Sequence, residues 1–142
     1  MAGVIMDRSA FLARVLEATN AHDVERIVGC FTPDYVNQTP CHPARGFTGT
    51  EQVRRNWTAI LAAVPDLEAT VVDEVTSGDH VWSEWEMRGT RRDHTPHLMR
   101  GVMIFGVDGD RARSCRFYLE PVAGDELTAD DFLATLGTGG AP

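Results

Sequence analysis

The stretch Tyr35-Val36-Asn37-Gln38-Thr39-Pro40, followed by Gly46-Phe47-Thr48-Gly49-Thr50-Glu51, decides the fold of this chain. Apolar residues at helical spacing precede it over residues 7–21 and 23–31, and a third helical pattern follows it to about residue 63, where Pro65 stops it. The remainder reads as strands over residues 67–76, 81–90, 97–107 and 112–122, and then as a closing helix over 128–136. This order predicts an α+β fold in which a curved sheet wraps around N-terminal helices and leaves a hollow.

Local signals predict where these elements begin and end. Asp23 is suited to cap the second helix, and Thr48 with Glu51 fits a capping box for the third. A similar pair, Thr128 and Asp131, is expected to open the closing helix, and residues 137–142 are expected to form a loose tail. Residues 32–34 are expected to turn the chain into a first strand over residues 35–39.

Length and charge limit the classes of function. The 142 residues, 43% of them apolar, fit a single domain spanning residues 1–142. Acidic residues outnumber basic ones by 21 to 13, and the resulting net charge of −8 argues against nucleic acid and membrane surfaces as partners. Residues 1–7 are not expected to be a signal peptide. Three cysteines, Cys30, Cys41 and Cys115, suit reduced thiols in a cytoplasmic protein and match no zinc spacing, so neither a metal nor a cofactor is predicted.

Alternation along the strands separates an inner face from an outer one. Residues expected to face inward are Val81, Ser83, Trp85 and Met87 on one strand, His97, Met99, Gly101, Met103 and Phe105 on the next, and Cys115, Phe117 and Leu119 on the last. The outer face mixes Trp82, Val102, Ile104 and Tyr118 with arginines and glutamates. Because a solvated sheet face is usually more polar, we expect a homodimer that packs through this outer face.

Several short motifs occur in an order typical of one family. They are Asn20-Ala21-His22-Asp23, Phe31-Thr32-Pro33-Asp34-Tyr35-Val36, Arg45-Gly46 with Gly49, Pro65-Asp66-Leu67, Gly78-Asp79-His80-Val81 and Tyr118-Leu119-Glu120-Pro121. In this order the chain resembles the SnoaL-like, polyketide cyclase-like branch of the nuclear transport factor 2-like superfamily. The resemblance implies a cone-shaped, cystatin-like α+β barrel that encloses an apolar cavity and is usually dimeric. Members include cyclases, isomerases, epoxide hydrolases and proteins without catalysis, so the fold alone does not fix the function.

Two departures from the family argue against particular reactions. Where related isomerases carry their base, the resemblance implies Thr39, and a threonine hydroxyl is no general base at neutral pH. Their second carboxylic acid would fall at Gly101, which has no side chain. The Asp-Arg-Asp set of the epoxide hydrolases cannot be assembled on the inner face. A ketosteroid isomerase reaction is therefore not expected.

Two residues are candidates for proton transfer. His97 shares the parity of the inward residues and titrates near neutral pH; an exposed, inert histidine at a strand end is the other interpretation. The resemblance implies an acid/base role for Glu120, whereas strand parity groups Glu120 with Arg116 and Tyr118 on the outer face, where it would pair with an arginine. The candidate ligand contacts are Tyr35, Asn37, Thr39, Trp57, Trp85, Met87, Met99, Met103 and Phe117.

The leading interpretation is a SnoaL-like protein whose apolar cavity binds a small hydrophobic, oxygenated molecule. As a cofactor-independent cyclase or isomerase it would transfer protons on a polyketide- or terpenoid-like substrate. Two other functions stay open at this point: a noncatalytic ligand-binding protein and a protein-interaction module built on the same fold.

Overall fold

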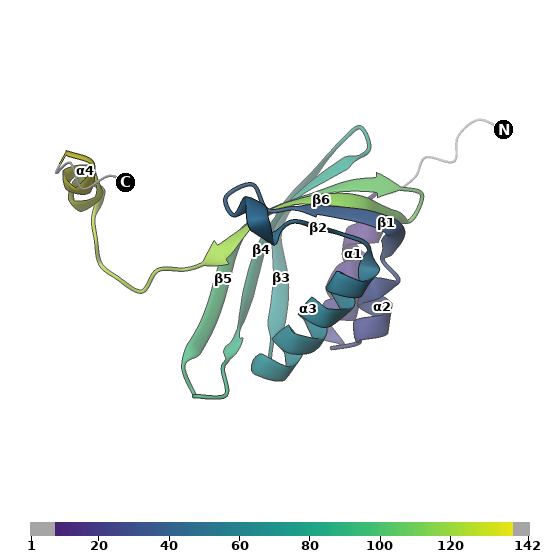
Figure 1. Cartoon of the computed structure of the whole chain (residues 1–142), viewed down its shortest axis with the longest axis horizontal. Helices are drawn as coiled ribbons and strands as arrows, with labels where there is room; N and C mark the ends of the chain where they lie inside the picture. Colours follow the sequence, from purple (N-terminus) through teal and green to yellow (C-terminus); the bar gives the residue numbers. More distant parts are fainter. Residues whose placement is uncertain (1–7, 138–142) are drawn as a thin grey trace.

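The structure, a computed structural model, describes residues 8–137 (Figure 1). The helices are α1 (Arg8–Asn20), α2 (Val24–Val28), α3 (Thr50–Ala63) and α4 (Ala129–Gly137), with a 3-10 turn η1 (Pro43–Arg45). The strands are β1 (Phe31–Gln38), β2 (Phe47–Thr48), β3 (Glu68–Ser77), β4 (His80–Thr90), β5 (Pro96–Asp108) and β6 (Arg111–Pro121). Residues 1–7, and the part of the expected tail at 138–142, lie outside the described residues.

All six strands form one mixed sheet in the order β2-β1-β6-β5-β4-β3. Strands β3 to β6 form an antiparallel meander, and β1 pairs in parallel with β6 and antiparallel with β2. The sheet curves, and α1, α2 and α3 lie within its concave side (Figure 1). The predicted α+β class and the curved sheet around N-terminal helices are confirmed.

The alternation predicted for the central strands sets the inner face. On β4, Val81, Ser83, Trp85 and Met87 are all buried, whereas Trp82 between them is 43% exposed. The indole N–H of Trp85 donates to Ser83 Oγ at 2.8 Å, and the Ser83 hydroxyl donates to the Met103 carbonyl at 2.7 Å. Each polar group on this buried strip therefore has a partner, as burial requires.

The first strand begins earlier than the sequence suggests. Residues 32–34, expected to form a turn, belong to β1, and Phe31, expected on the second helix, opens that strand and pairs with Ala112. The register with β6 shifts between Phe31 and Val36. Pro33 lies in this shifted stretch, and because proline cannot donate to a sheet, it is tolerated where regular pairing is interrupted. The turn-forming residues 32–34 therefore mark an irregular stretch within β1 and do not end the strand.

Helix capping follows the prediction in two cases out of three. The Asp23 carboxylate accepts from the Arg26 backbone N–H at 3.1 Å. Thr128 and Asp131 accept from each other's backbone N–H groups, at 3.2 and 2.8 Å. The predicted capping box of α3 is wrong, since its N-cap is Gly49 with φ of 91° and no side-chain cap.

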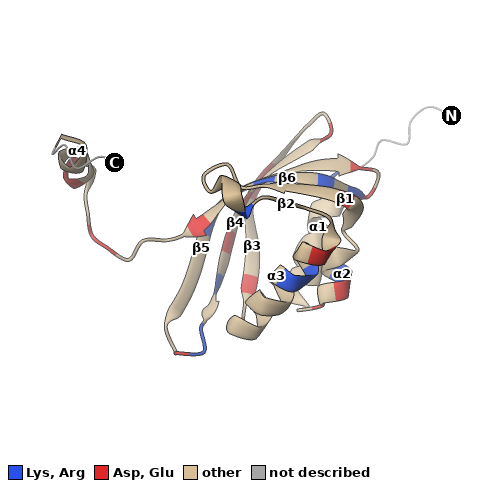
Figure 2. Cartoon of the chain, in the orientation of Figure 1, with Lys and Arg blue, Asp and Glu red and all other residues tan. Residues whose placement is uncertain are grey.

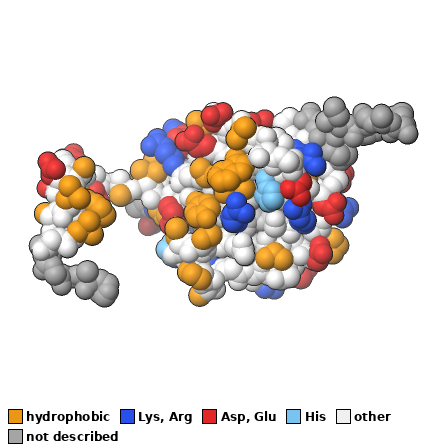
Figure 3. Space-filling model, turned by 90° about the horizontal axis from the view of Figure 1, so that it is seen from above, with side chains coloured by type: hydrophobic (Ala, Val, Ile, Leu, Met, Phe, Trp, Pro, Cys, Tyr) orange, Lys and Arg blue, Asp and Glu red, His pale blue; other side chains and the backbone are white. Residues whose placement is uncertain are grey.

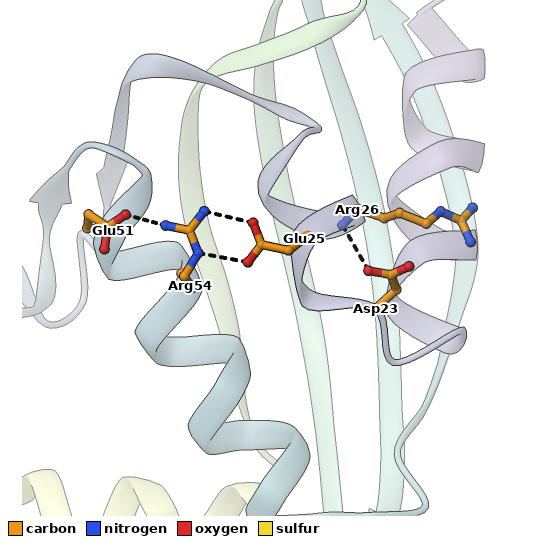
Figure 4. A network of polar contacts seen from close by, with 5 residues as sticks. All are labelled: Asp23, Glu25, Arg26, Glu51 and Arg54. Atoms are coloured by element: carbon orange, nitrogen blue, oxygen red, sulfur yellow. Dashed lines mark hydrogen bonds and ion pairs between the residues drawn. The ribbon is translucent and has the colours of Figure 1, made fainter.

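The two residues of that failed capping box have other places. Thr48 lies in β2, and the Glu51 carboxylate pairs with Arg54. Arg54 also holds the Glu25 carboxylate through two hydrogen bonds of 2.8 and 2.9 Å, so the guanidinium ties α2 to α3 (Figure 4).

The motif Asn20-Ala21-His22-Asp23 clamps α1 to the edge strand of the sheet. The Asn20 side-chain amide exchanges two hydrogen bonds with the backbone of Ala69, at 2.9 and 2.7 Å, and His22 Nε2 lies 2.7 Å from the Leu67 carbonyl oxygen. These contacts fix the end of α1 against β3, so His22 has a structural role.

Charge and apolar surface are distributed unevenly over the molecule. On α3 an acidic residue near the start is followed by basic ones, and charged residues of both signs are scattered along the sheet (Figure 2). Hydrophobic side chains gather beside charged ones on the body seen from above, and again on α4, which stands apart from the body (Figure 3). Exposed on and before α4 are Leu127, Phe132, Leu133 and Leu136. Within residues 8–137, no helix has the length and apolar character required to cross a bilayer.

Candidate functional site: a cavity inside the curved sheet

A cavity of about 310 Å³ lies between the helices and the inner face of the sheet. The residues expected to contact a ligand all line it: Tyr35, Asn37, Thr39, Trp57, Trp85, Met87, Met99, Met103 and Phe117. The walls are predominantly aromatic and aliphatic, as in most small-molecule sites, and the volume is at the lower end of their range of about 300–1,000 Å³. The strand parity that brings these side chains together is thus correct, and their role as ligand contacts stays a prediction.

Three polar residues form a connected line along the inner side of β1, called here the β1 ladder. The Tyr35 hydroxyl donates to Asn37 Oδ1 at 2.9 Å, and Asn37 Nδ2 donates to Thr39 Oγ1 at 3.3 Å. They lie on one face because side chains at i, i+2 and i+4 of a strand point the same way. The ladder therefore supplies polar groups on one wall of an otherwise apolar cavity.

Burial keeps two potential acids protonated here: Tyr35, which belongs to the β1 ladder, and its neighbour Cys115. The pKa of Tyr35 is raised well above its ordinary value, first by desolvation and then by the neighbouring Cys115. Burial also raises the pKa of the Cys115 thiol to about 12. Because the thiolate is the nucleophilic form, Cys115 is inert at neutral pH and acts as part of the wall. Tyr35 serves as a hydrogen-bond donor.

His97, at the start of β5, also lines the cavity and is partly buried. Desolvation lowers its pKa, and the positive charge of Arg91 lowers it further. The imidazole is therefore neutral at neutral pH, and a neutral imidazole is able to accept a proton. His97 is placed as parity predicts, facing inward with Met99 and Met103.

Glu120, the second candidate for proton transfer, is not among the residues that line the cavity. Its Oε1 lies 2.9 Å from Nε2 of His42, in the loop after β1, and both side chains are more than a third exposed. The register of β5 and β6 sets Glu120 opposite Arg100, but Arg100 pairs with Glu86 instead. The Glu120 carboxylate, which strand parity led us to expect beside an arginine, thus contacts a histidine instead. A role in proton transfer stays a prediction for this residue.

The cavity lining contains no aspartate or glutamate among the described residues. Its titratable side chains are those of Tyr35, Arg45, His97 and Cys115. Sequence reasoning missed Arg45, on η1, and Asn56, on α3. A signal for Asn56 existed, since Val53, Asn56, Trp57 and Ile60 follow helical spacing and all line the cavity.

Neither of the two positions that correspond to the isomerase carboxylic acids, Thr39 and Gly101, carries a carboxyl group. Thr39 is buried and lines the cavity, so a hydroxyl stands where the resemblance places the base. Gly101 has a φ of 153°, and a Cβ built there would lie 2.1 Å from the backbone oxygen of Tyr118. No side chain fits at this point of β5, which explains why the second acid has no counterpart.

Metal ligation has no obvious centre in the described part of the chain. Within residues 8–137, no three His, Cys, Asp or Glu side chains gather closely enough to hold an ion.

A mixed sheet curved around three helices, with a side-chain-lined cavity at its centre, defines a nuclear transport factor 2-like protein. The chain belongs to the SnoaL-like domain family, whose model matches residues 12–114. None of the curated proteins compared with the chain is similar to it in sequence.

Solved structures support the same assignment. IdmH, a putative polyketide cyclase from Streptomyces antibioticus, is 25% identical, with 92% of this chain and 99% of that chain covered and a TM-score of 0.70. SalBIII is 18% identical over 80% of this chain and 90% of that chain, with a TM-score of 0.70. It is described as an epoxide hydrolase/cyclase-like enzyme with a role in pyran ring formation in the polyether salinomycin.

A third structure holds a small molecule. It is a hypothetical protein with a ketosteroid isomerase-like fold from Catenulispora acidiphila, in complex with trimethylamine. It is 18% identical, covers 76% of this chain and 84% of that chain, and has a TM-score of 0.67. At this identity the likeness shows the fold alone. Together these comparisons confirm the predicted family and fold.

Proposed function

We propose that this SnoaL-like protein binds a small hydrophobic, oxygenated molecule, polyketide- or terpenoid-like, and promotes proton transfer on it without a cofactor. The products would be those of a cyclisation or an isomerisation. The observation that carries the proposal is the position of His97, which lines an apolar cavity and is the one lining group, among the described residues, suited to exchange a proton near neutral pH.

The geometry suggests how the parts would act. Neutral His97 would take a proton from a carbon acid of the substrate, and the β1 ladder would hold a substrate oxygen by hydrogen bonds. The apolar walls would exclude water and hold a flexible substrate in a folded shape, which lowers the entropic cost of ring closure. The cyclase-like descriptions of IdmH and SalBIII support a reaction of this class.

Hydrogen–deuterium exchange at the α-carbon of 2-tetralone, followed by NMR, tests this proposal without knowledge of the natural substrate. We expect the wild-type protein to accelerate exchange and His97→Gln to lose about 10²–10⁴-fold of that acceleration, the usual contribution of a general base. Circular dichroism and a thermal melt establish that the variant is folded. Unchanged exchange in a folded His97→Gln variant contradicts the proposal.

Glu120→Gln is the matched test of the other candidate. We expect its exchange rate to stay within about twofold of wild type, since Glu120 pairs with His42 and is not among the lining residues. A loss as large as that in His97→Gln would instead assign proton transfer to Glu120.

A noncatalytic ligand-binding protein is the second candidate function. The observation that favours it is the lack of any carboxylate in the described lining, with Thr39 where the related isomerases have their base. Binding of 2-tetralone, seen by calorimetry, without acceleration of exchange would support this alternative over catalysis.

The outer face of the sheet supports a homodimer, which we also propose. Cross-strand pairing aligns Val75, Trp82, Ile104 and Arg116 in one row, in which Val75 and Trp82 are exposed and Ile104 is buried. The Arg116 guanidinium lies 5.9 Å from the centre of the Trp82 ring. A second row carries the ion pairs of Glu86 with Arg88 and Arg100. Exposed aromatic and arginine side chains beside satisfied charges are typical of the centre and rim of an interface.

A further inference from the structure

Arg45 is an exposed residue on a short loop at the edge of the cavity. It ends η1, where its backbone N–H donates to the His42 carbonyl at 2.9 Å and that of Gly46 donates to the Pro43 carbonyl at 3.2 Å. Pro43 occupies the first position of the turn, which limits its backbone freedom. The Arg45 side chain lines the cavity.

Two contacts hold this loop against the sheet. A Cβ at Gly46 would lie 3.1 Å from the Asn37 carbonyl oxygen, so the backbone packs closely against β1 at that point. On the other side, the His42 imidazole lies 2.9 Å from the Glu120 carboxylate and ties the loop to β6. Arg45 is therefore carried by a segment fixed to both neighbouring strands.

The contacts between β1 and the segment before β2 bring the Arg45 loop close to the Thr39 end of β1. Phe47 pairs with Asn37 in the antiparallel strands, and a Cβ at Gly46 would lie within 4.0 Å of the Gln38 Cα. Arg45 and Thr39 are each the next residue beyond these contacts, and both line the cavity.

The hydrogen bonds of the β1 ladder have a direction. The Tyr35 hydroxyl donates to Asn37 Oδ1, and Asn37 Nδ2 donates to Thr39 Oγ1. Asn37 Oδ1 and Thr39 Oγ1 therefore each already accept one hydrogen bond within the ladder. The Thr39 hydroxyl then has its own proton left, with no acceptor for it among residues 8–137. The ladder therefore presents a donor at its Thr39 end, in the cavity that Arg45 also lines.

The charge of Arg45 is not neutralised within the described part of the chain. Arg54, Arg88 and Arg100 each pair with a glutamate, whereas no ion pair forms between Arg45 and an acid of residues 8–137. The lining contributes no carboxylate to balance it either. In a chain of net charge −8, this gives the cavity a local preference for an anion.

We propose that Arg45 and Thr39 bind the carboxylate of an otherwise apolar ligand, so that the substrate is a hydrophobic carboxylic acid whose carbon body fills the cavity. The inference rests on the proposed binding function and names the class of ligand. A guanidinium and a hydroxyl are both donors to a carboxylate, and a charge-assisted hydrogen bond of this kind is stronger than a neutral one.

Calorimetric titration of the full chain with 2-naphthylacetic acid and with 2-naphthylacetamide tests the proposal, since the two probes share shape and differ in charge. We expect wild type to bind the acid about tenfold more tightly than the amide. Arg45→Gln removes this preference and leaves binding of the amide within about twofold. Thr39→Val weakens the acid less, by about threefold, because a hydroxyl is a neutral donor. In wild type, 0.5 M added salt is expected to reduce the ratio of affinities for the acid and the amide, because salt screens the interaction between the carboxylate and the guanidinium.

Arg55→Gln is the matched control, because Arg55 is an exposed arginine of α3 that bonds to Gln52 and does not line the cavity. It is expected to retain the preference for the acid. Equal affinity of wild type for both probes, or an undiminished preference in folded Arg45→Gln, overturns the carboxylate site.

Failure of the proposed reaction gives a different pattern of results. If the acid preference depends on Arg45 but His97→Gln exchanges 2-tetralone at the wild-type rate, the carboxylate site stands and catalysis by His97 falls. If neither naphthyl probe binds, ligand binding by the cavity falls, and the carboxylate site falls with it.

Discussion

The two faces of the sheet use the same strands and treat charge in opposite ways. On the outer face, the Glu86 carboxylate is held by Arg100 and Arg88, and hydrogen bonds to them lower its pKa. On the inner face, burial raises the pKa values of Tyr35 and Cys115 and lowers that of His97, so each group is kept neutral. Desolvation favours whichever form carries no charge. The comparison shows that the interior suits the neutral body of a ligand, and that charge is confined to the edge of the cavity.

The largest expected difference between the two environments is in thiol reactivity. Cys41 is exposed, whereas Cys115 is buried with a pKa of about 12, so about one Cys115 in 10⁴ is a thiolate at pH 8. We expect iodoacetamide to label Cys41 at least about a hundredfold faster than Cys115, measured by peptide mass spectrometry. Comparable rates in the folded protein would show that the interior is open to solvent.

A methyl group on β5 tests how tightly the strands pack at the centre of the sheet. Gly101→Ala would place its Cβ 2.1 Å from the Tyr118 carbonyl oxygen, and we expect a loss of about 3 kcal/mol or more in the free energy of unfolding. Gly78→Ala is the control, because Gly78 also has a positive φ, of 60°, but has open space around it. Its expected loss is about 1 kcal/mol, by urea denaturation. Equal losses would mean that β5 and β6 are not in close contact here.

The outer face is tested by removing its exposed aromatic anchor. Trp82→Ala is expected to weaken a homodimer about thirtyfold or more, measured by sedimentation equilibrium, since a central tryptophan of an interface is commonly worth about 2 kcal/mol or more. Phe132→Ala, on α4, is the control, because Phe132 is an aromatic residue outside the sheet and is more exposed than Trp82. A wild-type protein that is monomeric at all concentrations would refute the dimer.

The smallest expected effect separates the two faces by pH. Because the pKa of His97 is lowered from 6.5 in the folded state, the unfolded chain takes up this proton first, and stability falls as pH decreases below about 6.5. His97→Gln should lack this component in denaturation midpoints measured from pH 8 to 5. Glu86 acts in a lower pH range. Because its pKa is lowered from 4.5 in the folded state, its contribution to stability is complete above about pH 4.5 and is lost as pH falls below that value. A difference between wild type and His97→Gln that does not vary with pH would contradict the assignment.

Much of the cavity could be predicted from strand parity. Alternation on β4, β5 and β6 identified Trp85, Met99 and Phe117 as lining residues, because period 2 depends only on sequence position. Parity also grouped Glu120 with the outer residues, although the resemblance implied a catalytic role. Strand parity could not predict that Glu120 contacts His42, because His42 lies in a loop whose path depends on its packing.

Local signals failed where long-range pairing replaced them. Residues 32–34 have turn-forming chemistry, yet β1 continues through them because Phe31 on one side and Val36–Gln38 on the other pair with β6. Thr48 and Glu51 fit a capping box, yet Thr48 is used by β2 and the α3 cap falls to Gly49. In both cases hydrogen bonds between distant segments outweighed a local preference of about 1 kcal/mol.

The sequence by itself determined the order of helices and strands, the side of each strand that turns inward and the family, because these follow from periodicity and short motifs. Only the tertiary structure decided that Arg45 and Thr39 line the same cavity and that Glu120 lies against His42. Those juxtapositions arise from the curvature of the sheet and the packing of one loop, and neither is encoded in the spacing of residues along the chain.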